Sequence, residues 1–395
     1  MQWLLLALGS MFVQQSFVTF GKVLPAVLAP VIFSELRFDP SWLGVYVGIM
    51  AAASLIAQAG CGNLIVRYGA LRISQVALLL TGLGLGFATL GQIPLLILSA
   101  IAIGAAAAST PASSHLLGRY SPIKQAPLVF SIKQTAVPVG LLIAGFLGPL
   151  FTELYGWRNT LLIIAGSCVL LAITLEFLRE KFDGDRDKNR NLHLSDFKGT
   201  ILLVLRASEL RSLAFGCFAF VGLQTTFVAY FIIYLTETGY SLMEAGRIFS
   251  SAFLVAIPGR ILWGWLSSNF INPKLILGFL ALGMFVTVSL TSLFDSTWND
   301  WQITLIAAGV TATVFSWHGI VLAEAVRLFP ASMKGAVTGG VLSFGQCGGL
   351  VLPLIYSVLL SFTGSYKLGF LICALPALFV GLLLLSSVRR NAKLN

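Results

Sequence analysis

The chain has 395 residues, of which 57% are hydrophobic and only 10% are charged, with a mean hydropathy of +0.91. A soluble domain carries roughly 25% charged residues, so this chain cannot cover a water-facing surface. Apolar residues are spread almost evenly from Trp3 to Leu385, which predicts one polytopic helical membrane protein. The net charge of +10 would suggest nucleic acid as a partner. However, the basic residues lie in short loops without interleaved aromatics, so no nucleic-acid role is expected.

Twelve membrane-spanning helices are predicted, because crossing about 30 Å of hydrocarbon takes roughly 20 apolar residues. Segmentation at charged and Gly/Pro/Asn-rich breaks gives 3–33, 41–66, 72–91, 94–118, 126–152, 158–178, 211–236, 242–267, 274–294, 301–326, 334–361 and 367–388. The first stretch is longer than the apolar region of a signal peptide and has no basic residues before it, so we expect it to be kept. With about 33 residues per helix and loop, no soluble catalytic domain fits, and we expect no enzyme activity.

Basic residues in alternate loops predict the orientation, since cytoplasmic loops carry an excess of Lys and Arg. With the N-terminus in the cytoplasm, eighteen Lys and Arg lie inside and four outside. The four outside are Arg37, Arg158, Arg247 and Lys367. Both termini are therefore expected in the cytoplasm, in the cell (inner) membrane of a bacterium.

A polar segment from Arg179 to Arg211, with eight basic and six acidic residues, divides the chain in two. We expect an N-terminal six-helix half at 1–178, a cytoplasmic linker at 179–210 and a C-terminal half at 211–395. A short amphipathic helix is expected in the linker, over Asp196 to Leu205.

The two halves resemble one another at short matches. Arg119-Tyr-Ser-Pro122 in helix four is matched 208 positions later by Arg327-Leu-Phe-Pro330 in helix ten. Ser131-Ile-Lys-Gln134 in helix five is matched 212 positions later by Ser343-Phe-Gly-Gln346 in helix eleven. Internal repetition of this kind is the usual build of secondary transporters.

The loop after helix two reads Gly62-Asn-Leu-Ile-Val-Arg67-Tyr-Gly69-Ala-Leu-Arg72, which is similar to the signature loop of the major facilitator superfamily. The resemblance covers essentially the whole chain and implies a monomeric, two-half transporter that works by alternating access. It also implies that Arg67, Gly69 and Arg72 form a cytoplasmic gate. The acidic member of the signature is missing, because Val66 stands in its place.

Helix eight carries Gly259-Arg260-Ile-Leu-Trp-Gly264, which resembles the monocarboxylate and oxalate/formate branches of the superfamily. In those branches an arginine at this place faces the substrate carboxylate. The motifs of drug exporters are incomplete, because helix five lacks the closing glycine pair and the stretch from Leu95 to Gly104 lacks the early arginine.

Three basic residues remain inside the predicted helices: Lys22, Lys133 and Arg260. An ionised side chain at mid-membrane costs about 2.5–3.5 kcal/mol and normally faces a cavity or a partner. Glu324 is the one clearly intramembrane acid, so a positive cavity that binds an anion is expected. The alternatives are that Lys22 and Lys133 extend toward the membrane surfaces, and that Arg260 caps carbonyl groups or pairs with Glu324.

Other polar residues have supporting roles in this hypothesis. Gln134, Gln346 and Gln224 supply hydrogen bonds to substrate or between helices. His318 and Glu324 are candidates for proton coupling, although Glu324 could instead pair with Arg327 or Lys334.

The sequence contains no phosphate-binding loop and no metal-ligand spacing among its three histidines, so neither cofactor nor metal is expected. The five cysteines lie in apolar runs and are interpreted as small buried hydrophobes. Three functions follow: a proton-coupled carrier of a small organic anion, such as a monocarboxylate; a proton-antiport exporter of a drug or metabolite; or a non-transporting sensor or assembly factor on a carrier scaffold.

Overall fold

The computed structural model describes residues 2–122, 126–187, 202, 204–295, 297–327 and 334–392. Every regular element within these ranges is a helix. The helices of the first half are α1 (Gln2–Val27), α2 (Ala29–Leu36), α3 (Trp42–Tyr68), α4 (Ala70–Ala88), α5 (Ile93–Ala105), the 3₁₀ turn η1 (Ala106–Ala108), α6 (Ser109–Tyr120), α7 (Ala126–Gln134), α8 (Ala136–Thr174), η2 (Leu175–Leu178) and α9 (Arg179–Phe182). Those of the second half are α11 (Ser208–Glu237), α12 (Leu242–Asn269), α13 (Pro273–Thr291), α14 (Asp300–Val314), α15 (His318–Arg327), α16 (Lys334–Thr363) and α17 (Tyr366–Ala392).

Eleven helical stretches in the described part of the chain are long and apolar enough to span a membrane. One of them, Ile132–Phe182, has 51 residues, about 76 Å at 1.5 Å per residue, which is far too long for one crossing. Gly156 divides it, since its backbone (φ 78°, ψ 158°) leaves the helical region. Only glycine adopts this conformation readily. The stretch therefore contains the two spans predicted at 126–152 and 158–178, and the twelve-helix prediction is confirmed.

Four of the predicted spans are not continuous helices. The first changes direction at Leu28, because Pro30 in the first turn of α2 cannot continue the hydrogen bonding of α1. The span at 94–118 contains the 3₁₀ turn η1, and the span at 126–152 is interrupted at Thr135. The span at 301–326 is interrupted over residues 315–317. Hydropathy measures the length of an apolar segment and carries little information on such local changes.

Helix starts on the described loops follow local capping rules. Ser241 and Glu244 form a reciprocal capping box at α12, and Asn299 with Gln302 forms another at α14. Asn272 accepts a hydrogen bond from the Lys274 amide at the start of α13. Each cap satisfies amide groups that have no acceptor within the helix.

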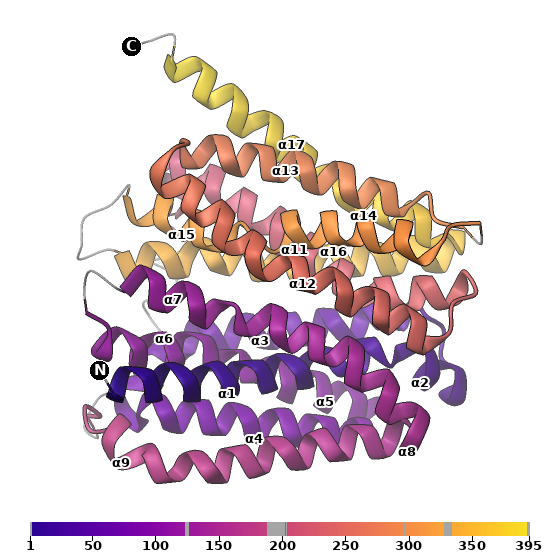
Figure 1. The fold of residues 1–395 in the computed structure, drawn as a ribbon, viewed down its shortest axis with the longest axis horizontal. Helices are drawn as coiled ribbons and strands as arrows, with labels where there is room; N and C mark the ends of the chain where they lie inside the picture. The colour runs from indigo at the N-terminus through magenta and orange to yellow at the C-terminus, as the bar shows by residue number, and fades with distance from the viewer. Residues whose placement is uncertain are drawn as a thin grey trace. The chain divides into compact units, whose positions relative to one another are not determined.

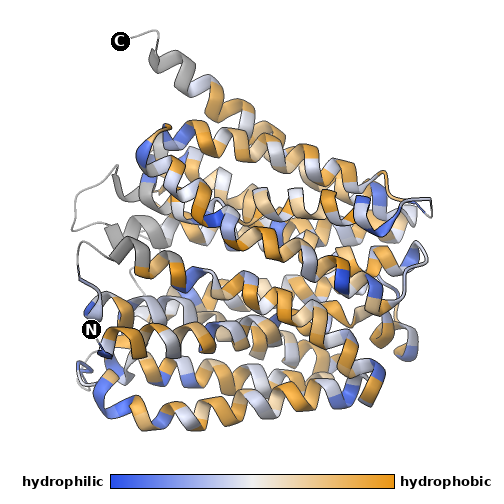
Figure 2. Cartoon of the chain, viewed as in Figure 1, coloured by the Kyte–Doolittle hydropathy of each residue, from blue (hydrophilic) through white to orange (hydrophobic). Residues whose placement is uncertain are grey.

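The chain groups into two compact units: residues 1–38 with 49–195, and residues 39–48 with 196–395. In the first unit α1, α4 and α8 pack against one another. In the second unit α11 packs on α16, α12 on α14, and α13 on α17 (Figure 1). Hydrophobic residues run along the helices, and the hydrophilic residues concentrate toward helix ends and loops (Figure 2). Residues 188–201 and 203 of the predicted linker 179–210, which include most of the helix expected over Asp196–Leu205, lie outside the described residues.

Candidate functional site

A buried polar cluster joins three helices of the first unit. Thr110 on α6 donates its hydroxyl to the Gln15 side-chain oxygen on α1, at 3.2 Å. The ammonium of Lys133 on α7 donates to the Thr110 carbonyl at 3.5 Å. Nearby on α1, Gln14 donates to the Ser74 carbonyl at 3.2 Å. The cluster concentrates hydrogen-bonding capacity in an apolar unit, where such groups are costly to bury.

Lys133 has no exposed surface in the structure. The alternative that it extends toward the membrane surface is therefore wrong, because a side chain that did so would leave its terminal atoms accessible. Lys133 and Gln134 are the last two residues of α7, directly before the interruption at Thr135. From this position Lys133 reaches α6, where its ammonium contacts the Thr110 carbonyl.

Lys22 is half-buried on α1. It lies seven residues after Gln15, so the two residues share one face of the helix about two turns apart. Thr19, which is 9% exposed, lies between them on that face. The structure thus places Lys22 on the polar face of α1 but shows no contact from it to the Thr110 cluster.

In the second unit, Arg260 on α12 reaches the interruption between α14 and α15. Its Nε donates to the carbonyl of Phe315 at 2.9 Å. Phe315 closes α14, and its carbonyl lies where the helical hydrogen-bond ladder stops. The alternative in which Arg260 caps a carbonyl group is therefore confirmed for its Nε atom.

Two polar side chains in the same interruption are buried. Ser316 is 1% exposed and Trp317 has no exposed surface. Within the described part of the chain, neither the Ser316 hydroxyl nor the Trp317 indole nitrogen makes a hydrogen bond. The Trp317 ring packs against Phe220 on α11, with centroids 5.4 Å apart. The sequence analysis missed both residues, because serine and tryptophan in an apolar run resemble ordinary packing.

The proton-coupling candidates lie on α15. His318 is its first residue and is half-buried beside Trp317, with ring centroids 4.5 Å apart. Glu324 has no exposed surface. The side chains of its proposed partners, Arg327 and Lys334, lie outside the described residues. The remaining amide candidates are Gln224 on α11 and Gln346 on α16, and both side chains are half-buried.

The loop between α3 and α4 shows how the predicted gate is held. Gly69 has φ 102°, a conformation that favours glycine. Arg72 forms an ion pair with Glu176 at 3.0 Å, and Arg67 packs over the Tyr68 ring at 5.6 Å. The ion pair therefore connects Arg72 to the end of the sixth span, whereas the contact described for Arg67 is with its neighbour Tyr68.

Asp183 supplies a carboxylate at this loop. It is 2% exposed and accepts hydrogen bonds from the amides of Leu71 at 2.7 Å and Arg72 at 3.0 Å. Burial raises the pKa of the Asp183 carboxyl, and the two amide hydrogen bonds oppose that rise. A negative charge is favourable at this end of α4. The sequence analysis counted Asp183 among the charges of a solvated linker and missed this role.

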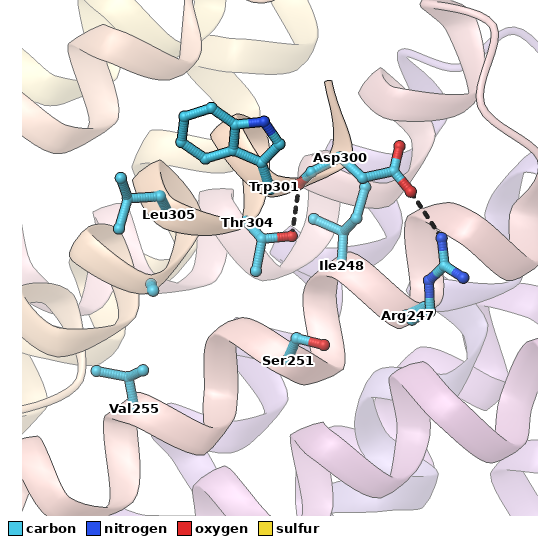
Figure 3. Close-up of a pocket in the computed structure, with 9 residues that line it drawn as sticks. Arg247, Ile248, Ser251, Val255, Asp300, Trp301, Thr304 and Leu305 are labelled. Atoms are coloured by element: carbon cyan, nitrogen blue, oxygen red, sulfur yellow. Dashed lines mark hydrogen bonds and ion pairs between the residues drawn. The ribbon is translucent and has the colours of Figure 1, made fainter. Parts of the chain in front are cut away.

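A separate pocket of about 700 Å³ lies between α12 and α14 (Figure 3). At one end Arg247 pairs with Asp300 at 2.6 Å. Trp301 and Leu305 in its wall are each 65% exposed, so the pocket opens to the outside of the unit. None of the predicted binding residues lines it, and we do not assign the site to it.

Comparison with known proteins places these features in a family. The family model described as "Major Facilitator Superfamily" matches residues 11–325, and the chain belongs to this superfamily. Among solved structures, that of the nucleoside transporter NupG (D323A mutant) is similar, with a TM-score of 0.76 at 13% identity over 95% of this chain and 99% of that one. This likeness concerns the fold.

Three curated relatives are transporters of differing cargo. The sialic acid transporter NanX of Escherichia coli is 25% identical over 62% of this chain and 59% of its own length. The putative metabolite transport protein YwtG of Bacillus subtilis is 24% identical over 84% of this chain and 80% of its own. The quinolone resistance protein NorB of Staphylococcus aureus is 24% identical over 47% of this chain and 40% of its own. The chain is thus a multi-pass membrane transporter, and these relatives do not agree on a substrate.

Proposed function

We propose that this transporter carries a small organic anion, a monocarboxylate, together with protons by alternating access. The observation that carries the proposal is that each unit places a basic side chain at an interrupted helix. Lys133 meets α6 at Thr110, and Arg260 meets the end of α14 at Phe315. A guanidinium suits a planar carboxylate, and a lysine adds a compact charge. NanX, a named relative, is a sialic acid transporter, and sialic acid is itself a carboxylic acid.

Uptake into proteoliposomes tests this proposal. Radiolabelled lactate, pyruvate and sialic acid would be offered to the wild-type protein and to the variants Arg260→Ala and Lys133→Ala. Loss of a charge-assisted interaction is worth about 1.5–3 kcal/mol, so uptake below saturation is expected to fall about 10- to 100-fold. Arg247→Ala, on the same helix but paired with Asp300 at the surface, and the exposed Lys367→Ala are the matched controls. Wild-type uptake by both site variants would refute the proposal.

An exporter of a drug or metabolite in exchange for protons is the second candidate. Two observations favour it: the likeness to NorB and the complete burial of Glu324, which suits a residue that carries a proton within the membrane. In this case Glu324→Gln abolishes proton-driven export of a lipophilic cation, whereas Arg260→Ala does not. In the anion carrier, Arg260→Ala removes uptake, and a lipophilic cation is not transported.

Further parts of the proposal concern the setting of the protein. We place both termini in the cytoplasm of a bacterial cell, with the chain acting as a monomer in the inner membrane. The excess of basic residues in alternate loops supports this orientation.

A further inference from the structure

The interruption between α14 and α15 has buried hydrogen-bonding groups without visible partners. Ser316 Oγ and Trp317 Nε1 are enclosed by protein and make no hydrogen bond within the described residues. A buried donor that remains unsatisfied is costly, and most buried polar atoms in proteins have a partner. These two atoms on consecutive residues are therefore available to a bound group that accepts hydrogen bonds.

The chemistry of the surrounding groups specifies what they bind. An indole N–H and a guanidinium donate hydrogen bonds and cannot accept them. In the first turn of α15, a ten-residue helix, the amides of Ile320 and Val321 donate to the Trp317 carbonyl, and the N-terminus of the helix attracts negative charge. A ligand at this place must therefore accept hydrogen bonds and is favoured if it is anionic. An ammonium group or a metal cation would instead be repelled by the charge of Arg260.

Arg260 and Ser316 face the same stretch of chain. Arg260 Nε holds the carbonyl of Phe315, the residue directly before Ser316. A methyl group built on Gly259, the neighbour of Arg260, would lie 3.5 Å from Ser316 Oγ. The serine hydroxyl thus lies against α12 at the level of the arginine, although Arg260 and Ser316 are 56 residues apart in sequence.

The first unit also has a buried hydroxyl at the corresponding interruption. The 3₁₀ turn η1 and Ser109 precede residues 314–317 by 208 positions, the offset that relates Arg119 to Arg327. Ser109 is also buried without a hydrogen bond from its hydroxyl within the described chain. Lys133 donates to the carbonyl of the next residue, Thr110. A buried hydroxyl without a described partner thus lies at the interruption of the fourth span and at that of the tenth, but the basic side chain beside it comes from the fifth span in one unit and from the eighth in the other.

We propose that Ser316 Oγ and Trp317 Nε1, together with Arg260 and the N-terminus of α15, bind the carboxylate group of the transported anion. This inference rests on the proposed function and adds two residues that determine its specificity. Each residue donates one hydrogen bond to a carboxylate oxygen. A neutral amide of the same shape accepts fewer hydrogen bonds and carries no charge, so it binds more weakly.

The test is equilibrium binding to the purified protein in nanodiscs. The probes are lactate, pyruvate, sialic acid, lactamide as the uncharged analogue, and sodium chloride at matched ionic strength. The variants are Ser316→Ala and Trp317→Phe, the second of which keeps a ring against Phe220. The controls are Ser361→Ala and Trp301→Phe, at exposed positions, and thermal unfolding is measured for each variant to confirm that it folds.

Each site variant is expected to weaken carboxylate binding about tenfold and to weaken lactamide binding by a smaller factor. Sodium chloride is expected to show no binding to the wild type or to either variant. Quenching of tryptophan fluorescence by the carboxylate is expected to be lost in Trp317→Phe alone. If both variants bind carboxylates as the wild type does while Arg260→Ala does not, the two atoms hold only solvent and the inference is wrong, but the proposed function stands. Chloride binding without carboxylate binding also overturns it. If the wild type binds no carboxylate, both proposals fail.

Discussion

Asp183 supplies a carboxylate to a loop whose own sequence lacks an acidic residue. The loop carries Val66 where the superfamily signature has an acid. The structure places Asp183 at the amides of Leu71 and Arg72, in the turn that Gly69 makes possible. A carboxylate at the start of α4 thus comes from a residue that follows the sixth span.

Removing this carboxylate is expected to destabilise the protein. In Asp183→Ala the amides of Leu71 and Arg72 lose their acceptor, which costs about 1–3 kcal/mol. The control is Glu180→Ala, three residues earlier and exposed. Thermal unfolding of the two variants in the same detergent measures the difference, and equal unfolding temperatures would show that solvent replaces the carboxylate.

The pH dependence of stability gives a second test of Asp183. Burial raises the pKa of its carboxyl in the folded protein, so the folded state retains a proton over a pH range in which the unfolded chain has released it. Stability from this group is therefore greatest below the unfolded pKa, declines as the pH rises to the folded pKa, and is constant above it. The decline is expected to be absent in Asp183→Asn. A wild-type and a variant profile of identical shape in thermal unfolding from pH 4 to 7 would contradict this.

Residues that break the hydropathy pattern of a span can be predicted from the sequence, whereas functional residues that fit the pattern are missed. Lys133 and Arg260 were recognised as candidates because a charge within an apolar run has an evident energetic cost. Ser316 and Trp317 do not stand out in the hydropathy of their span, and their lack of hydrogen-bond partners depends on the local backbone. Asp183 was hidden among the charges of a linker, because its hydrogen bonds join residues more than 100 positions apart.

At the scale of helices, hydropathy gave the spans correctly because each must cover the hydrocarbon thickness. It did not give the interruptions at η1, Thr135 and residues 315–317. The break near Leu28 has a local cause in Pro30, but residues 315–317 contain neither glycine nor proline. Tertiary contacts such as that of Arg260 with Phe315 accompany this break, and they cannot be read from local sequence.

Close packing of α11 on α16 depends on the absence of a side chain at Gly348. A methyl group there would overlap the carbonyl of Phe218 on α11, a backbone atom that cannot rotate away. Gly348→Ala is therefore expected to destabilise the protein by about 1–3 kcal/mol. Gly259→Ala is the control, because its methyl group would meet its nearest neighbours at 3.5 Å or more. Thermal unfolding compares them, and an equal effect of the two substitutions would mean that the α11–α16 contact adjusts freely.

For the whole molecule, the distribution of charge predicts an orientation that labelling can test. The native cysteines are free thiols, and all but the half-buried Cys347 are buried. A new cysteine at the surface is therefore expected to react with a maleimide faster than the native ones. Glu153→Cys should react with a membrane-impermeant maleimide in intact cells, because its loop is predicted outside. Glu180→Cys should react only after the cells are permeabilised. The reverse pattern would place both termini outside.

The hydrogen bonds of Asp183 also constrain the order in which the first unit is completed during synthesis. The amide of Leu71 leaves the ribosome 112 residues before the carboxylate that binds it, a delay of roughly 6–22 s at about 5–20 residues per second. Until the sixth span has been inserted, water must satisfy the first turn of α4. The start of the third crossing is therefore fixed only when the last helix of its own half arrives.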